Sequence, residues 1–484
     1  MTSELSRQAF VRGALGVAAS VVLASCASPP ASGPAPAAEP TPAPPHWGDL
    51  GNLVVLPSDP DYAGVKTVFN TRFAGSTPVA VVTARSVDDV RRAIGFAATN
   101  GVGVTARSGG HSYVGASTAN GTMVLDLRGL PGEIAYDAGT GLVTVSAAAD
   151  VASVQRALSP HGRSIPTGSC PSVGLAGLAL GGGLGADARR DGLTCDALAS
   201  ATVVLPSGQV VTASADQHAD LFWALRGGGA NWGVVTSCTF ATFPATDRDV
   251  VTLAFDEEAT ADVLLGWHAW LTAADRAVWG MVNVTVGPGS GRCSVVLATP
   301  PGDGPSLADA VTSAMGVRAT SHSVRTLDHP AFVDYFGGGP DAVRPRAFVA
   351  GSDVVQGMTR SAADALVAAT SAWPHELTPA TMVVESLSGA IQDVAPDATA
   401  FPWRRHAASV QWYVETPTPQ LVDAANGWLS VAHAAVGAHS AGGYVNYLEP
   451  STPAARYFGA NLPRLGELRR RYDPGRLMFS SFDW

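Results

Sequence analysis

The segment from Arg107 to Gly115 has the sequence RSGGHSYVG and follows a short run that is typical of a buried strand. Its two consecutive glycines let backbone amides approach an anionic group closely. Ser108 and Ser112 add hydroxyl donors beside those amides. The pattern therefore predicts a turn that binds phosphate. The alternative is an ordinary turn around a hydrogen-bonded His111.

A second glycine-rich segment runs from residue 168 to 185 and has the sequence GSCPSVGLAGLALGGGLG. Residues 181–186 formally match the dinucleotide-binding fingerprint, with alanine in the last place. We reject that interpretation, because no clear strand precedes the match and no acidic residue lies about 20 positions further on. What remains is a wall with few side chains, close to Cys170, that leaves room for a flat ligand.

Composition limits the possible functions of the chain. Its 484 residues are 46% hydrophobic and 14% charged, which predicts two to three domains with ample core. The net charge is −10, Lys66 is the single lysine, and no stretch concentrates positive charge, so nucleic acid is not an expected partner. Five cysteines cannot staple so long a chain. Neither these cysteines nor the scattered histidines show metal-ligand spacing, so no metal site is predicted.

Residues 1–26 are predicted to be an export signal with a lipid-attachment site. Arg7 and Arg12 precede an apolar run that ends at Leu23 and is too short to span a bilayer. The sequence LASC at 23–26 resembles a bacterial lipobox, whose cysteine carries the lipid after cleavage. The preceding residues resemble a twin-arginine signal with Gln8 in place of the second arginine, which leaves the twin-arginine and general secretion routes both open. The alternative is an N-terminal helix with an incidental Cys26.

Residues 27–45 contain eight prolines and six alanines, which is typical of an extended, semi-rigid tether. We therefore expect an exported, extracytoplasmic protein that touches the membrane through a lipid on Cys26.

Strands and helices are predicted to alternate from about His46. A buried strand at 79–82 is followed by a helix that Ser86 caps and that ends at Asn100-Gly101. Further strands are expected at 102–106, 122–127 and 142–147, and within 201–213, which turns at Ser207-Gly208. From about residue 246 the composition changes, and seven of the 11 tryptophans lie between Trp267 and Trp428.

The motifs together resemble those of the covalent flavoprotein oxidases of the vanillyl-alcohol oxidase superfamily. The resemblance is closer to the berberine-bridge-enzyme-like and glucooligosaccharide-oxidase-like branch, and it extends from about residue 65 to the C-terminus. RSGGHS at 107–112 is similar to the loop whose histidine bonds to the flavin 8α-methyl group, and GSCPSVG at 168–174 to the segment whose cysteine bonds to flavin C6. YVNYLE at 444–449, YFGAN at 457–461 and YDP at 472–474 are similar to the C-terminal signature.

The resemblance implies an α+β fold. A PCMH-type FAD-binding domain in two parts is expected over 46–245, followed over 246–440 by a substrate-binding domain with an antiparallel sheet covered by helices. Residues 441–484 are expected to return to the FAD-binding domain.

The resemblance also implies the cofactor and its ligands. FAD is expected to carry an 8α-histidyl bond to His111 and a 6-S-cysteinyl bond to Cys170. Arg226–Val235 is similar to a glycine-rich strand that lines the flavin. Val173 matches a position where a small side chain accompanies oxygen access, which favours an oxidase. The other expected cofactor contacts are Arg107, Ser108, Gly109, Gly110, Ser112, Gly174, Gly177, Gly181, Gly233, Val235, Asn446 and Tyr447.

Tyr447 is the base that the resemblance implies. A phenol has an ordinary pKa of about 10, so it needs neighbours that favour the phenolate before it can act near neutral pH. Arg404 and Arg405 are the candidate cationic neighbours. Gln411 stands where some relatives have a catalytic Glu, and Tyr413 shares its face if this segment is a strand. The alternative role of Tyr447 is a hydrogen bond to the flavin edge.

The sequence thus predicts an FAD-dependent oxidase that takes hydride from an alcohol or hemiacetal carbon and reduces O2 to H2O2. The substrate is expected to be a sugar, an oligosaccharide or a secondary metabolite, and the protein is expected to be a monomer. Two alternatives stay open. One is a flavin dehydrogenase with another electron acceptor, and the other is a non-catalytic lipoprotein that binds a ligand.

Overall fold

The computed structural model describes residues 45–230, 232–288 and 291–484. The predicted export signal, the tether as far as residue 44 and Asn231 lie outside the described residues.

The predicted helix after Ser86 is α2, Val87–Asn100, and its ends form as the sequence indicates. The Ser86 hydroxyl accepts a hydrogen bond from the Asp89 amide at 3.1 Å, which satisfies one of the free N–H groups of the first turn. Gly101 ends the helix in the left-handed conformation, with a φ of 64°. Val90, Ile94 and Ala97 are buried along one face, so the helix packs on the neighbouring sheet.

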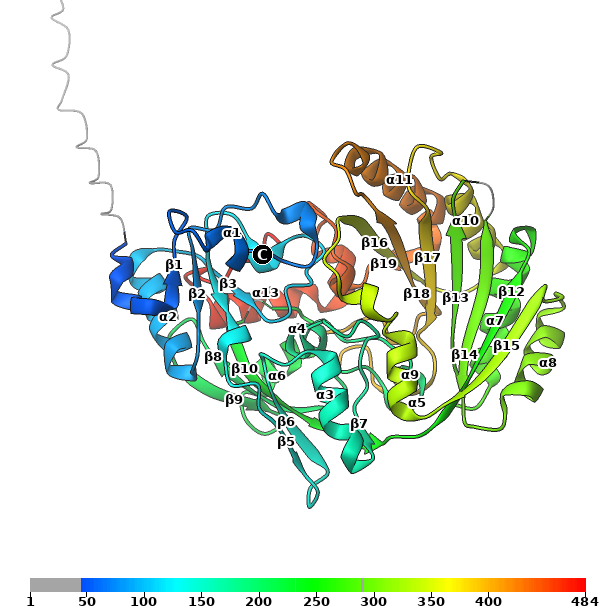
Figure 1. Ribbon diagram of the computed structural model, residues 1–484, viewed down its shortest axis with the longest axis horizontal. Coiled ribbons are helices and arrows are strands. Elements are labelled where there is room, and N and C mark those ends of the chain that lie inside the picture. The colour runs from blue at the N-terminus through cyan, green and yellow to red at the C-terminus, as the bar shows by residue number, and fades with distance from the viewer. Residues whose placement is uncertain (1–44, 231, 289–290) are drawn as a thin grey trace, which may run out of the picture. The chain divides into compact units, whose positions relative to one another are not determined.

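Two sheets build the N-terminal region. In the first sheet β4 lies between β2 and β3 and pairs in parallel with both, because α2 crosses over from β2 to β3 (Figure 1). The second sheet is antiparallel throughout. In spatial order the first sheet is β1 (Val54–Val55), β2 (Ala80–Thr83), β4 (Met123–Asp126) and β3 (Val104–Arg107). The second is β5 (Ile134–Asp137), β6 (Leu142–Ser146), β10 (Val234–Ala241), β8 (Leu198–Val204) and β9 (Val210–Ser214).

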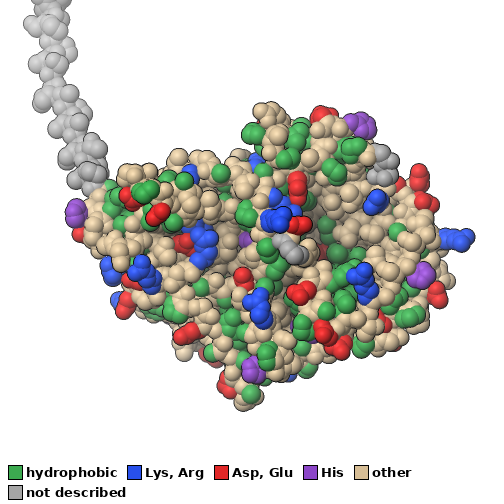
Figure 2. All heavy atoms as spheres, viewed as in Figure 1, with side chains coloured by type: hydrophobic (Ala, Val, Ile, Leu, Met, Phe, Trp, Pro, Cys, Tyr) green, Lys and Arg blue, Asp and Glu red, His purple; other side chains and the backbone are tan. Residues whose placement is uncertain are grey.

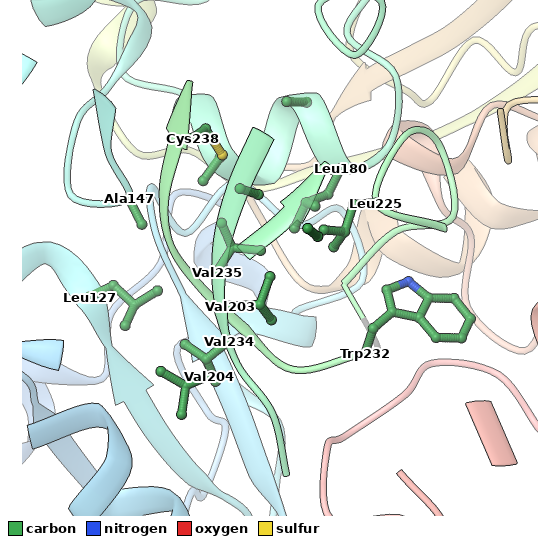
Figure 3. Close-up of a cluster of buried hydrophobic side chains, with 14 of the residues drawn as sticks. Leu127, Ala147, Leu180, Val203, Val204, Leu225, Trp232, Val234, Val235 and Cys238 are labelled. Atoms are coloured by element: carbon green, nitrogen blue, oxygen red, sulfur yellow. The ribbon is translucent and has the colours of Figure 1, made fainter. Parts of the chain in front are cut away.

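The core of this region joins the two sheets through aliphatic side chains and Trp232 (Figure 3). A separate pair of short strands, β7 (Arg163–Ser164) and β11 (Phe243–Pro244), lies at the transition to the next region.

An eight-stranded antiparallel sheet forms the central region. Two of its inner strands, β17 (Ala380–Ser386) and β18 (Ala408–Glu415), largely alternate buried and half-buried residues, so each has one face toward helices and one face free for a site. In spatial order the strands are β15 (Ser321–Leu327), β12 (Arg248–Phe255), β14 (Arg292–Thr299), β13 (Trp279–Val286), β17 (Ala380–Ser386), β18 (Ala408–Glu415), β16 (Phe348–Val355) and β19 (Ser440–Gly442).

Four helices cover one face of this sheet (Figure 1). They are α7 (Thr260–Ala273), α8 (Gly304–Met315), α10 (Arg360–Ser371) and α11 (Gln420–Val436). Trp267 of α7, Trp412 of β18 and Trp428 of α11 are fully buried between these helices and the sheet. Trp412 therefore packs in this core rather than beside a ligand, although Gln411 and Tyr413 flank it in sequence.

The C-terminal residues pack in the core of the N-terminal region. Tyr457, Phe458 and Leu465 belong to that core, and the Phe479 amide donates to the Val104 carbonyl at 2.7 Å. Residues 46–484 form one compact unit. The remaining helices are α1 (Tyr62–Val65), α3 (Val151–Leu158), α4 (Leu175–Leu180), α5 (Ala188–Asp191), α6 (Ala219–Ala224), α9 (His329–Phe336), α12 (Ala455–Phe458) and α13 (Leu462–Tyr472).

The predicted α+β class is confirmed, with the central antiparallel sheet covered by helices. Among the described residues, none of the helices has the length and apolar character that crossing a membrane requires.

Candidate active site

A cavity of about 500 Å³ lies between the glycine-rich loops of the N-terminal region and the free face of the central sheet. The segments that line it include the loop after β3, residues 168–178, the glycines at 229 and 233, strands β16 to β18, the short 3-10 helix Val445–Tyr447, and the tail near residues 478–482. In the part of the chain that the structure describes, Arg346 and Glu385 are the formally charged side chains of this lining. The outer face in Figure 2 mixes basic and acidic side chains.

The two glycine loops meet backbone to backbone. A Cβ atom on Gly109 would come 2.2 Å from the Gly174 amide nitrogen, so neither loop tolerates a side chain at this contact. Gly177 also lines the cavity, but a Cβ there would meet nothing within 4 Å. Gly109 therefore permits the close packing of the two loops, and Gly177 leaves free space along the cavity wall.

His111 is oriented by two neighbours. Its Nε2 lies 3.0 Å from the Ser172 hydroxyl, and its ring stacks on Phe69 with a centroid distance of 4.1 Å. Burial lowers the pKa of His111 to about 4, so the imidazole is neutral at physiological pH. Cys170 also lines the cavity, with its Sγ 3.8 Å from the same Ser172 hydroxyl.

Strand β18 supplies the opposite wall. Gln411 and Tyr413 alternate along it and both line the cavity, which is the shared face that the sequence predicts. The Gln411 amide donates to the Tyr113 hydroxyl at 2.6 Å. Tyr413 stacks on Phe348 at 5.0 Å, so this end of the cavity is mainly aromatic.

The 3-10 helix Val445–Tyr447 brings Asn446 and Tyr447 into the cavity lining. The Asn446 amide donates to the Leu178 carbonyl at 3.0 Å and to the Tyr444 hydroxyl at 2.8 Å. The Tyr444 hydroxyl accepts from the Gly183 amide at 2.7 Å. These bonds tie the C-terminal motif to the second glycine loop. Tyr447 itself stacks on Tyr113 at 5.4 Å.

Burial and the nearby Glu385 carboxylate both raise the pKa of Tyr447 well above its ordinary value. The expected cationic neighbours are elsewhere. Arg404 is buried in an ion pair with Asp196 at 2.7 Å, and Arg405 binds the Gln392 carbonyl. The prediction that Arg404 and Arg405 favour the phenolate is therefore wrong.

Glu385 lines the cavity, although the sequence motifs did not predict it as a site residue. It lies on β17 and interacts electrostatically with Tyr447 and Tyr444. Burial raises its pKa to about 7, so this carboxyl exchanges its proton near neutral pH. The available signal was a single charged residue within the otherwise uncharged strand 380–386. Tyr113, Arg346 and Phe348 also line the cavity and were not predicted as site residues.

Three predicted cofactor contacts do not line the cavity. Arg107 is fully buried and pairs with Asp126 at 2.8 Å, so its guanidinium stabilises the loop without lining the cavity. Gly181 faces Asn446, whose side chain occupies the space where a Cβ would lie. Val235 packs in the apolar core with Val203 (Figure 3).

The cavity lining brings together most of the remaining predicted residues. These are Ser108, Gly109, Gly110, His111, Ser112, Cys170, Val173, Gly174, Gly177, Gly233, Gln411, Tyr413, Asn446 and Tyr447. Within the described residues, no group of three or more His, Cys, Asp or Glu side chains is arranged to hold a metal ion.

The cavity thus offers space for a flat cofactor between glycine loops and an aromatic wall, with His111, Cys170 and Glu385 in its lining. Two family models match the chain: the FAD binding domain at residues 78–214 and the "Berberine and berberine like" segment at 443–478. The chain therefore contains an FAD-binding domain and the C-terminal segment found in berberine-like proteins, and it is an FAD-linked oxidoreductase.

Several curated relatives match over most of their length. An uncharacterised FAD-linked oxidoreductase of Bacillus subtilis is 27% identical over 434 residues, which cover 88% of this chain and 95% of the relative. Chitooligosaccharide oxidase of Gibberella zeae is 29% identical and covers 85% of this chain and 88% of its own. A solved structure of glucooligosaccharide oxidase from Acremonium strictum, described as holding 6-S-cysteinyl, 8α-N1-histidyl FAD, has a TM-score of 0.81 at 21% identity. That match covers 89% of this chain and 97% of the other.

Proposed function

We propose that the protein is an oxidase that transfers hydride from the CH–OH carbon of a carbohydrate to bicovalently bound FAD and reduces O2 to H2O2. The observation that carries the proposal is the shared cavity. His111 and Cys170 line one part of it, and Tyr447, Glu385 and Gln411 line the facing part.

The residues present fit FAD. Gly109 and Gly174 pack too closely for side chains, and Gly177 leaves open space at the cavity wall, as a flat dinucleotide requires. His111 is neutral and Cys170 lies in the same lining, so both are suited to hold the cofactor. When bound, FAD would supply the hydride acceptor.

Proton removal is assigned to Tyr447 and Glu385 together. The raised pKa of Tyr447 means that its hydroxyl is protonated in the resting protein. Glu385, with a pKa of about 7, is the neighbouring group that can accept that proton as Tyr447 takes the one from the substrate hydroxyl. Both residues hold or move a proton and form no bond to the substrate.

A carbohydrate is the substrate class that the relatives favour, since chitooligosaccharide oxidase aligns with 85% of this chain. The aromatic rings of Tyr113, Phe348 and Tyr413 offer apolar surfaces. The Tyr113 and Tyr413 hydroxyls and the Gln411 amide offer hydrogen bonds. The substrate loses two electrons and two protons, which O2 receives as H2O2, so the reaction balances without another reactant.

Val173 supports O2 as the acceptor, because it is small and lines the cavity near Cys170. Reduced protein mixed with air-saturated buffer in a stopped-flow instrument should reoxidise within the turnover time. Reoxidation over minutes would favour the dehydrogenase alternative.

The experiment that tests the function is a peroxide-coupled assay of the purified protein against aldoses, oligosaccharides and aromatic alcohols. We expect the highest kcat/KM with an oligosaccharide or aldose. Peroxide formation with aromatic alcohols alone would reject the carbohydrate class. If the purified protein showed no flavin absorbance, the proposed flavin-dependent oxidase activity would be excluded.

We also propose that the protein is exported and anchored by a lipid on Cys26. The support is the sequence pattern at 1–45, which lies outside the described residues apart from Pro45. Cys26→Ala should move the protein from the membrane fraction to the soluble exported fraction in the native host. Unchanged fractionation of C26A would contradict the anchor.

A further inference from the structure

Ser172 contacts both side chains that are proposed to hold the cofactor. Its Oγ is 3.0 Å from His111 Nε2 and 3.8 Å from Cys170 Sγ. The first distance is that of an ordinary hydrogen bond, and the second is a weak contact to sulfur. One hydroxyl therefore lies between the two attachment points but engages the histidine more strongly.

The His111 ring is held in two ways. Stacking on Phe69, with 22° between the planes, limits the tilt of the imidazole. The bond from Nε2 to Ser172 limits its rotation within that stack. When Nε2–H donates to the Ser172 hydroxyl, Nδ1 carries the lone pair and is left for a second partner.

The imidazole is also neutral at physiological pH, because burial lowers the pKa of His111 to about 4. Hydrogen bonding to the Ser172 backbone and the charge of Asp150 oppose this effect but are smaller. A neutral imidazole keeps a lone pair on one nitrogen, which a nucleophile requires.

We propose that Ser172 is a positioning residue that orients His111 for its bond to the flavin 8α carbon. The inference rests on the proposed bicovalent FAD. Overall, one C–H bond of the methyl group and one imidazole N–H bond break, and a C–N bond forms. The two electrons and two protons pass to dioxygen, the oxidant of the proposed reaction, and give H2O2.

Orientation matters for this bond because attack on carbon requires the ring lone pair to point at that carbon. A ring released by Ser172 keeps the Phe69 stack but gains freedom to rotate. The Cys170 bond should depend less on Ser172, because 3.8 Å is a weak contact. The prediction is therefore selective loss of the histidyl bond.

Trypsin makes this selectivity measurable. It cuts after arginine, so His111 falls in peptide 108–128 and Cys170 in peptide 164–189. Bicovalent FAD joins the two peptides into one species, whose mass is that of both peptides plus FAD less four hydrogen atoms. A flavin held by Cys170 alone appears on peptide 164–189, and peptide 108–128 is then free.

The full chain should be expressed with Ser172→Ala, Ser172→Thr and Ser172→Val. Thr and Val have the same shape and differ in the hydroxyl group. We expect S172A and S172V to lower the rate of formation of the joined species roughly tenfold, and S172T to restore it. Ser58→Ala is the control, because Ser58 is an exposed serine outside the cavity lining. S58A should resemble the wild type.

Flavin retained on peptide 164–189 shows that S172A and S172V have folded around the cofactor. Joined species at wild-type rates in both variants would overturn the proposal. Equal loss of both bonds in both variants would also overturn it, because Ser172 would then support the whole loop. Absence of the joined species in the wild type would instead reject bicovalent FAD, which separates the two failures.

Discussion

Glu385 is the acidic side chain in the cavity lining, and burial raises its pKa to about 7. A carboxyl group with this pKa loses its proton within the physiological range, whereas the buried Tyr447 phenol does not. The pair separates two tasks: Tyr447 contacts the substrate hydroxyl in the proposed reaction, and Glu385 receives the proton.

Glu385→Gln should therefore change the pH dependence of the enzyme. In the wild type, kcat/KM should rise with pH through about 7, because the acceptor must be deprotonated. E385Q should lower kcat by roughly 10²–10⁴-fold and remove that limb of the profile. The control is Glu258→Gln, which changes an exposed carboxylate outside the cavity lining. An unchanged limb near pH 7 in E385Q would assign the titration to another group.

At the scale of elements, Gly109 and Gly177 of the two glycine loops differ in how much space they leave for an added side chain. Gly109→Ala would place a Cβ 2.2 Å from backbone and should destabilise the fold with or without cofactor. Gly177→Leu meets open space at the cavity wall, so it should leave the fold intact but reduce FAD content.

Thermal melting and the ratio of flavin to protein absorbance distinguish these cases. We expect G109A to lower the melting temperature, and G177L to lower the flavin ratio by more than half. Gly95→Ala, in an open position on helix α2, is the control and should retain both values. A fully loaded G177L protein would contradict the position of the cofactor at this wall.

A second element-scale feature ties the Tyr447 segment to the sheet. We call Asp353, His433, Glu449 and Arg456 the His433 clamp. His433 of α11 bonds Asp353 at 2.7 Å and Glu449 at 2.6 Å, and Arg456 bonds Asp353 at 2.9 Å. Because Glu449 follows Tyr447 by two residues, the clamp holds the C-terminal end of the segment that carries Tyr447.

The two carboxylates raise the pKa of His433 to about 9. A raised folded-state pKa means that the stabilisation is fully present below about pH 6.5 and is lost as pH rises through about 9. His433→Gln should thus cost roughly 2–3 kcal/mol of unfolding free energy near pH 6 and little at pH 10. Denaturant melts at both pH values measure this, with the exposed His375→Gln as the control. An equal cost at both pH values would show that packing, not charge, stabilises the clamp.

At the scale of the whole molecule, buried polar bonds connect the N-terminal and central regions. The Asn70 side chain is fully buried, donates to the Phe348 carbonyl at 3.1 Å and accepts from the Phe348 amide at 3.3 Å. The Arg346 amide donates to the Phe69 carbonyl at 3.0 Å beside them. Phe69 and Phe348 both line the cavity, so this connection also sets the distance between its walls.

We therefore expect the protein to unfold in one calorimetric transition. Asn70→Ala removes the side-chain partner of the Phe348 amide, whereas the Phe348 carbonyl still accepts from the Arg72 guanidinium at 3.1 Å. The substitution should lower stability by about 1–3 kcal/mol. Scanning calorimetry of the wild type and N70A tests this, with exposed Asn120→Ala as a comparison. Two resolved transitions in the wild type would show that the regions unfold independently.

Local patterns predicted much of the fold. The Ser86 cap, the Gly101 end of α2 and the first strands depend on neighbouring residues, and all are found as expected. The identification of Gln411 and Tyr413 on one face also succeeded, because strand alternation is local. The roles of Arg107, Gly181, Val235 and the Arg404-Arg405 pair could not be predicted this way. Their partners lie far along the chain or on the other side of a loop.

The sequence by itself determined that two glycine-rich loops, at 107–115 and 168–185, offer backbone amides and little side-chain bulk, because that property depends on consecutive residues. Only the tertiary structure decided how those residues work together. It joins Gln411 to Tyr113 and Ser172 to His111 by hydrogen bonds. It also brings the charge of Glu385 near Tyr447 and buries Arg107 in an ion pair with Asp126. The physical reason is that burial and side-chain pairing depend on segments that meet only when the central sheet packs against the glycine loops.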